Sequence, residues 1–184
     1  MTTNANAVVV AGTGEIYVAA EGTALPTDFT ALPVGWTGLG YTGTDGVAFS
    51  KNRETSDLDA WQGTKVRVLT LSEPVTLTTR LLEMKTITLL TAFGGGTVAS
   101  TGSVSTFTPP AEGTNTVRAM VVDVTDGTKH YRFCFRRVQI EGTVDFSLTR
   151  TDAAGLNVTF GVLADPLGTW LAMTDDVTNW TFGS

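Results

Sequence analysis

The sequence predicts an all-β fold, a β-sandwich or β-barrel with one flanking α-helix and one long extended loop. Twenty glycines, together with abundant threonine and valine, favour strands and turns over helices. Several segments alternate polar and apolar residues with the period of two that a half-buried sheet requires. At 184 residues the chain is expected to form a single domain, residues 1–184, with room for a sizeable core.

The N-terminal third is predicted to contain little regular structure. A lead of residues 1–14 precedes a first short strand at residues 15–20. Residues 21–46 hold two prolines and several glycines, which disfavour helices and strands. The stretch ends at Asp45-Gly46, a pair that is typical of a tight turn.

A polar excursion follows the strand-like piece at residues 47–49. Residues 50–58 are mostly polar, and the excursion ends on Trp61. Because such a composition cannot bury itself, we expect a long loop that a partner orders. Strands are then predicted at residues 65–71 and 75–82, separated by Ser72-Glu73-Pro74.

The second half of the chain contains the helix and the clearest hairpin. Residues 84–93 have apolar positions at helical spacing and end at three glycines, although two threonines oppose a helix. Asp126-Gly127 separates two strand-like runs and predicts a hairpin. Alternation at residues 144–148 and 156–160, on either side of a turn, predicts another hairpin. The tail, residues 165–184, is expected to be irregular and acidic.

The charge distribution argues against a protein that grips nucleic acid. The formal net charge is −6, whereas proteins that bind phosphates are usually basic. All twelve Lys and Arg residues lie between Lys51 and Arg150, while the flanks hold eight acidic residues and no base. Such ends repel polyanions, and they are suited to meet basic patches on a partner or on another copy.

The sequence gives no sign of export or of a membrane span. The single cysteine, Cys134, excludes an internal disulfide. The N-terminus lacks the basic start and apolar run of a signal peptide, and no segment approaches the length of a membrane helix. We therefore expect a protein that is made in the cytoplasm, stays soluble and contacts no membrane.

No catalytic constellation can be assembled from these residues, and we expect no enzyme, cofactor or metal. His130 is the single histidine and flanks a turn, which is typical of an exposed residue and not of a general base. Cys134 lies mid-strand, where a lone cysteine is usually a small buried hydrophobe. Asp57 and Asp59 resemble a carboxylate pair for glycoside hydrolysis or calcium, but they have no spaced partner.

Two further features leave alternatives open. Arg132, Arg136 and Arg137 alternate with aromatic residues, and they either contact phosphate or mark a strand face that pairs with acidic residues. The tryptophan that ends the excursion, Trp61, belongs either to the core or to an anchor that fills a pocket of a neighbouring subunit.

The order of these features resembles a known family. The segments "GWTGLGYTGTDGVAFS", "LDAWQG", "KVRVLTLSEPVTLTTRLLEMKTITLLTAFG" and "YRFCFRRVQIEGTVDFSLTRTDAAGLNVTFGVLAD" are similar to the major tail proteins, or tail tube proteins, of long-tailed bacteriophages. The likeness is greatest to siphophages of actinobacterial hosts and covers roughly residues 15–166. The tail after Asp165 shows no pattern of that family.

This resemblance implies a β-sandwich of the tail-tube type, in a virion protein without an active site. Its subunits would form hexameric rings that stack around a tape-measure protein, with tail terminator and tail tip proteins as further partners. DNA would pass through the lumen without specific binding. The polar excursion, residues 44–62, would reach a neighbouring subunit, with Trp61 at its base. The interface residues implied are Asp45, Lys51, Arg53, Glu54, Asp57, Asp59 and Trp61.

Residues that line the lumen are predicted from chemistry. A basic lining would hold each passing phosphate, and an apolar lining does not suit a water-filled channel. Strands with small polar residues opposite an apolar face are therefore the candidates, and the predicted residues are Thr76, Thr78, Asp145 and Ser147. Two other functions remain open: a binding module, such as a capsid decoration or carbohydrate-binding sandwich, and a hydrolase that uses Asp57 or Asp59.

Overall fold

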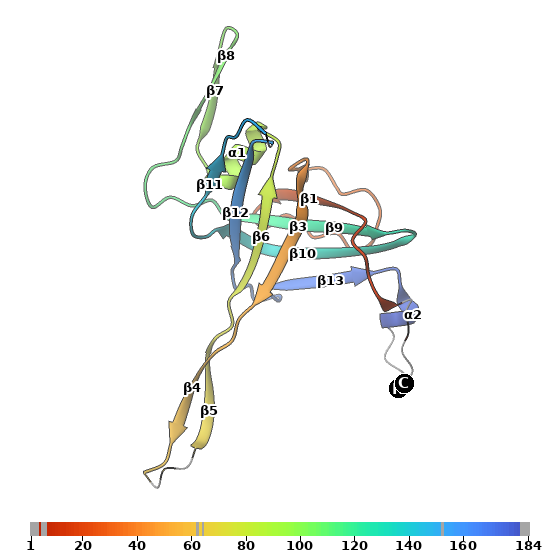
Figure 1. Cartoon of the computed structure of the whole chain (residues 1–184), viewed down its shortest axis with the longest axis vertical. Coiled ribbons are helices and arrows are strands. Elements are labelled where there is room, and N and C mark those ends of the chain that lie inside the picture. The colour runs from red at the N-terminus through yellow and green to blue at the C-terminus, as the bar shows by residue number, and fades with distance from the viewer. Residues whose placement is uncertain (1–3, 5–6, 62, 64, 152, 181–184) are drawn as a thin grey trace.

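The computed structural model describes residues 4, 7–61, 63, 65–151 and 153–180. Within these residues the chain is mostly strand, with one seven-residue helix and one helical turn (Figure 1). The elements are β1 (Thr13–Ala20), β2 (Thr37–Gly38), β3 (Thr42–Lys51), β4 (Glu54–Asp59), β5 (Lys65–Ser72), β6 (Val75–Leu81), α1 (Thr86–Ala92), β7 (Thr97–Thr101), β8 (Val104–Thr108), β9 (Arg118–Asp126), β10 (Lys129–Ile140), β11 (Asp145–Ser147), β12 (Gly155–Val162), β13 (Trp170–Thr174) and α2 (Val177–Trp180). The predicted all-β fold with one helix is confirmed.

One antiparallel sheet forms the body of the subunit. Its strand order is β2-β1-β9-β10-β12-β6-β3, with β13 paired to β10 and β11 paired to β12. Strand β10 bends this sheet, because its first part pairs with β9 and its last three residues pair with β12. A register shift between Phe135 and Val138 marks the bend, as expected where a bulge increases twist.

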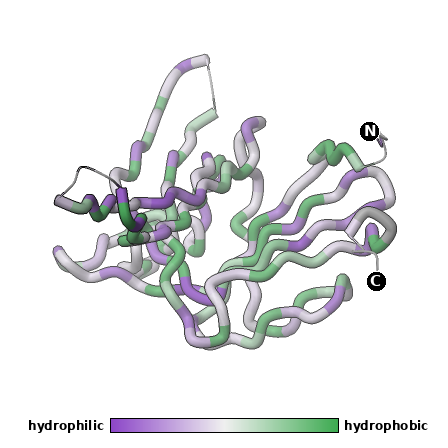
Figure 2. Tube along the Cα trace, turned by 90° about the horizontal axis from the view of Figure 1, so that it is seen from below, coloured by the Kyte–Doolittle hydropathy of each residue, from purple (hydrophilic) through white to green (hydrophobic). Residues whose placement is uncertain are grey.

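The bend divides the sheet into two halves that pack face to face. The β9 half consists of β2, β1, β9, the first part of β10 and β13, and the β6 half consists of β3, β6, β12 and β11. In Figure 1 the strands of the two halves cross steeply. Hydrophobic residues concentrate along these strands in Figure 2. The core between the halves contains Ile16, Val18, Leu77, Leu81, Met120, Phe135, Leu156, Val158 and Phe160.

The predicted alternation in β6 is confirmed. Val75, Leu77, Thr79 and Leu81 are buried, whereas the residues between them are half-buried or exposed. Helix α1 packs against this core through Ala92. The described residues include no helix with the length and apolar character needed to span a bilayer.

Residues 21–36 cover the outer face of the β9 half. As predicted, they contain no strand, but the predicted irregular stretch, residues 21–46, also includes the two-residue β2 and the start of β3. The guanidinium of Arg132, 5% exposed, donates to the carbonyl oxygens of Asp28 (2.6 Å) and Thr30 (3.3 Å) and lies 5.5 Å from the ring centroid of Phe29. This covering segment explains why Cys134, on the outer face, is fully buried.

Several sequence expectations are wrong in detail. The tight turn predicted at Asp45-Gly46 is wrong: the pair lies inside β3, where the pairing with β6 shifts register and Gly46 has a φ of 63°. Residues 50–58 form the end of β3 and most of strand β4, not a loop. The tail after residue 165 is not irregular, because it contains β13 and the turn α2. The hairpin at Asp126-Gly127 and the pairing of β11 with β12 are confirmed.

Candidate assembly surface

The most exposed part of the subunit is the hairpin β4–β5, here called the arm. Its strands pair only with each other among the described residues, and all their side chains are exposed. Figure 1 shows the arm extending away from the body. An isolated two-stranded hairpin is at best marginally stable in water. The arm therefore requires a surface outside this subunit to become rigid.

The arm carries more apolar surface than its polar sequence suggested. Leu58, Val66, Val68 and Leu71 are each more than half exposed. Trp61 lies at the tip and is 100% exposed. Its predicted place at the base of the excursion is wrong, and so is the alternative that it belongs to the core of this subunit. Exposed apolar residues in such a projection are typical of a protein–protein contact.

Ion pairs fix the root of the arm. Both Lys51 Nζ and Arg53 Nε lie 2.6 Å from carboxylate oxygens of Glu73, and they hold the pKa of that carboxyl below its usual range. The amide of Asn52 donates to the carbonyl of Pro74 at 3.0 Å. These contacts set the direction in which the arm leaves the body. Lys51 and Arg53 thus have partners within the subunit, and Glu73 was missed by the sequence prediction.

The other predicted interface residues are distributed along β3 and the arm. Glu54 accepts a hydrogen bond from Ser72 Oγ (3.0 Å), and Asp57 pairs with Lys65. Asp59 is exposed on the arm. Asp45 is exposed in β3, away from the arm. The structure therefore groups six of the seven residues at the arm and its root and separates Asp45 from them.

A second projecting hairpin, β7–β8, was not predicted. Figure 1 shows it at the end of the body opposite the arm. Its root is packed by Phe107 against Phe93, with ring centroids 5.4 Å apart. Gly96 is required there because its φ is 107° and a Cβ would lie 2.5 Å from the carbonyl oxygen of Thr108. The available signal was two β-branched and hydroxyl-rich runs around Gly102, without any charged residue.

The four residues predicted to line a lumen share one face of the β6 half. Thr76 and Thr78 lie opposite Gly161 and Thr159 of β12. Asp145 and Ser147 lie opposite Asn157 and Gly155 of the same strand. Since residues two apart in a strand share a face, all four project from the outer face of the β6 half, away from Leu77 and Phe160. Asp145 is exposed.

The β6 half also has two unpaired edges. Within the described residues, β3 pairs only with β6, and β11 pairs only with β12. Each edge presents backbone donors and acceptors that another strand can satisfy. Because all neighbours in this half are antiparallel, β3 and β11 run in opposite directions.

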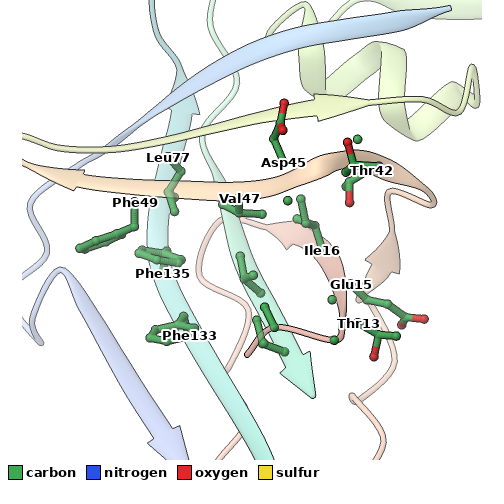
Figure 3. Close-up of a pocket in the computed structure, with 18 of the residues that line it drawn as sticks. Thr13, Glu15, Ile16, Thr42, Asp45, Val47, Phe49, Leu77, Phe133 and Phe135 are labelled. Atoms are coloured by element: carbon green, nitrogen blue, oxygen red, sulfur yellow. The ribbon is translucent and has the colours of Figure 1, made fainter. Parts of the chain in front are cut away.

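An apolar groove opens between the two halves (Figure 3). Its volume is about 620 Å³, and its walls include Ile16, Val47, Phe49, Phe133 and Phe135. No histidine or cysteine lies among its lining residues, and its acidic residues Glu15 and Asp45 point away from the apolar floor in Figure 3. Such a groove offers contacts for apolar groups and no arrangement for general acid–base catalysis.

The residues considered for chemistry have structural environments. His130 Nδ1 lies 2.7 Å from Asp175 Oδ2. Burial raises the pKa of the Cys134 thiol to about 11, which suppresses the reactive thiolate. Asp57 pairs with Lys65 on the arm. Among the described residues, no cluster of three or more His, Cys, Asp or Glu side chains is arranged to hold a metal ion.

Two of the three clustered arginines, Arg132 and Arg137, pair with acidic residues, as one of the two interpretations predicted. Arg132 makes a two-point contact with Asp123, with Nε–Oδ1 at 2.6 Å and Nη2–Oδ2 at 2.7 Å. Arg137 Nε lies 2.7 Å from Glu21 Oε1. Arg132 is buried, so it cannot contact phosphate.

Comparison with known proteins gives one family. The model of a family described as "Phage tail tube protein" matches residues 1–181. No curated protein matches the chain.

Proposed function

The chain belongs to the phage tail tube proteins, and on that premise we propose that its copies form hexameric rings that stack into the hollow tube through which phage DNA is delivered. A structural role in the phage tail follows from the family, and such proteins are typically not enzymes. The ring, the stacking and the passage of DNA are the proposal. Its proposed partners are further copies, a tape-measure protein, and tail terminator and tail tip proteins.

The observation that carries this proposal is the pair of free edges on the β6 half. Because β3 and β11 run in opposite directions, β11 of one copy can lie antiparallel to β3 of the next copy in the same orientation. Every added copy then leaves the same free edges, and the addition ends when a ring closes. Closure pairs the three residues of β11 with part of the longer β3 edge.

The arm supplies the second contact that a tube requires. Its exposed apolar residues and tip tryptophan gain burial when they pack on a neighbouring copy. Its root is held by Lys51, Arg53 and Glu73, so the arm has a defined direction before assembly. A preorganised arm loses less conformational entropy on binding than a disordered loop would.

The outer face of the β6 half is the proposed lining of the channel. Thr76, Thr78, Asp145 and Ser147 give it small polar side chains and a negative charge, while Arg80 on the same face donates to the carbonyl oxygen of Ala153 (2.8 Å). Such a lining lets polyanionic DNA slide without counterion-releasing contacts. The acidic protein as a whole has the same effect at longer range.

Electron microscopy of the purified protein tests the proposal, alone and with the other tail proteins that nucleate assembly. In an arm-shortened variant, residues 56–69 are replaced by Asn-Gly, which joins the paired residues Thr55 and Thr70 by a two-residue hairpin turn. The wild type should form tubes, and the variant should remain a folded monomer or single ring. Regular tubes from the variant would show that the arm is dispensable. A wild type that stays monomeric with its tail partners would refute the function.

A further inference from the structure

The C-terminal segment covers the edge of β10 and places the short strand β13 outermost at that point of the sheet. Strand β13 pairs with β10 over five residues, from Phe135 opposite Trp170 to Tyr131 opposite Thr174. Without β13, this part of β10 would have one unpaired side. That side would expose the backbone of a strand with Tyr131, Phe133 and Phe135 on one face. Apolar strands with an open edge pair readily with other chains.

Polar contacts hold the end of β13 in place. Asp175 accepts hydrogen bonds from the backbone amide of His130 (2.8 Å) and contacts its Nδ1 (2.7 Å). The nearly buried carboxylate of Asp176 lies 2.8 Å from Lys129 Nζ and 3.3 Å from the hydroxyl of Tyr131. These five residues, here called the latch, join the C-terminal segment to the start of β10.

The other end of β13 is held by an aromatic contact. The ring of Trp170 meets that of Phe49 in β3 at 5.2 Å with an edge-on geometry. The intervening strand residues are only half-buried, so β13 contributes little to the core. Its position and its attachments at both ends point to a role at the edge and not in the core.

We propose that β13 and its latch are an edge guard, which replaces the long apolar edge of β10 by a strand of five residues and so blocks self-association through β10. The guard stays on β10 in the free subunit and in the assembled protein. Its partner, when the guard is displaced, is a second copy that pairs irregularly with the exposed β10 edge. A guard has a role only if the protein self-assembles, so this inference rests on the proposed function. Its test, however, measures the association of the variants directly.

The single native cysteine provides a lock for this test. Leu171 lies directly opposite Cys134, and opposite residues of antiparallel strands have Cα separations of about 4.5–5.5 Å, within the range of a disulfide. Leu171→Cys therefore allows β13 to be tied to β10 by oxidation with diamide and freed by reduction. Loss of free thiol, without dimer on a non-reducing gel, verifies the bond.

Two full-length variants then test the guard. In Leu171→Cys, the oxidised and reduced forms should assemble equally well, because β13 does not leave β10. In Asp175→Asn/Asp176→Asn/Leu171→Cys, the reduced form should show a several-fold increase in light scattering from irregular aggregates, and oxidation should abolish this increase. Asp165→Asn/Leu171→Cys is the matched control, since Asp165 lies in the same segment but caps only the local amide of Leu167.

Two results would overturn the inference. If oxidised Leu171→Cys fails to assemble and reduction restores assembly, β13 must leave β10, and it is not a fixed guard. If the reduced latch variant associates no more than its control, the β10 edge is not a latent contact. Failure of the wild type to form tubes would refute the proposed function instead. The light scattering of the reduced latch variant, compared with its control, would still show whether β13 blocks association through β10.

Discussion

Arg132→Met removes a buried side chain that joins the sheet to the segment covering it. Arg132 is 5% exposed, and its guanidinium donates two hydrogen bonds to the Asp123 carboxylate. It also donates to two carbonyl oxygens of residues 28–30 and lies over Phe29. Methionine fills a similar volume but makes none of these bonds. The variant therefore leaves the Asp123 carboxylate without its cation and removes the hydrogen bonds from Arg132 to the covering segment.

The expected loss of unfolding free energy depends on the charge that remains after the substitution, which is the Asp123 carboxylate. Removing one partner of a buried ion pair costs about 3–5 kcal/mol of unfolding free energy, because the other charge stays uncompensated. The Asp123 side chain is 27% exposed, so water screens part of this cost. We therefore expect the lower end, about 3 kcal/mol. For a chain of this length, that loss lowers Tm by about 6–12 °C.

Thermal unfolding followed by circular dichroism, in the arm-shortened background that is expected to form no tubes, measures this loss. Arg137→Met is the matched control: its pair with Glu21 is 35% and 47% exposed, and such pairs contribute about 1 kcal/mol or less. Equal, small losses in both variants would refute the reasoning, because they would show that the covering segment does not depend on Arg132.

Four further outcomes are expected. Trp61→Ala should change the unfolding free energy of the monomer by less than about 0.5 kcal/mol, since the ring is fully exposed, yet abolish tubes in micrographs. The hydrogen bonds from His130 hold the pKa of Asp175 below its usual range, so their stabilisation is present above about pH 4 and is lost as the pH falls toward the folded-state pKa. NMR shifts of β13 amides should report that loss first. Gly96→Ala should destabilise the monomer by about 1–3 kcal/mol in chemical denaturation, because its φ of 107° and a carbonyl oxygen 2.5 Å from the added Cβ both oppose a side chain. Asp145→Lys should leave tubes intact but make them retain DNA in a salt-dependent manner, measured by co-sedimentation.

Each of these four predictions would be contradicted by a specific result. A large loss of monomer stability in Trp61→Ala would place the ring against the subunit and not a neighbour. Acid-insensitive β13 amides would mean that Asp175 does not hold the strand. Unchanged stability of Gly96→Ala would show that the root of β7–β8 can move. Asp145→Lys tubes that ignore DNA would place that residue on the outer wall.

The parts of the fold that the sequence predicted are those with one buried and one exposed face. In β6 the burial of side chains alternates along the strand, and in the β9–β10 hairpin the turn joins two adjacent strands. A short stretch of sequence therefore contains the whole pattern in both cases. The pairing of Arg132 with Asp123 was also within reach, because the two residues face each other across that hairpin. Local geometry decided each of these cases.

The strand predicted at residues 65–71 is confirmed as β5, but β4 and the hairpin β7–β8 escaped the same reasoning. Both faces of β4 meet solvent in the subunit, so no buried face imposed alternation on it. Trp61 was misplaced because a large aromatic ring is usually buried within its own subunit, and here it is 100% exposed. Strand β13 was missed because its partner, β10, lies some forty residues earlier, beyond any local pattern.

The proposed ring also determines which face of the β6 half lines the channel. One face of this half is covered by the β9 half, while Thr78 and Asp145 on the opposite face are exposed in the part of the chain that the structure describes. When identical units close into a ring, the circumference available outside the sheet exceeds that inside it. A second layer on the inner side would crowd against its neighbours, whereas on the outer side it has more room. Closure through β3 and β11 therefore places the bulky β9 half outward and the small polar residues toward the axis. In the proposed ring, the space available to the β9 half and the polar side chains of the opposite face therefore both favour the same face as the lining of the channel.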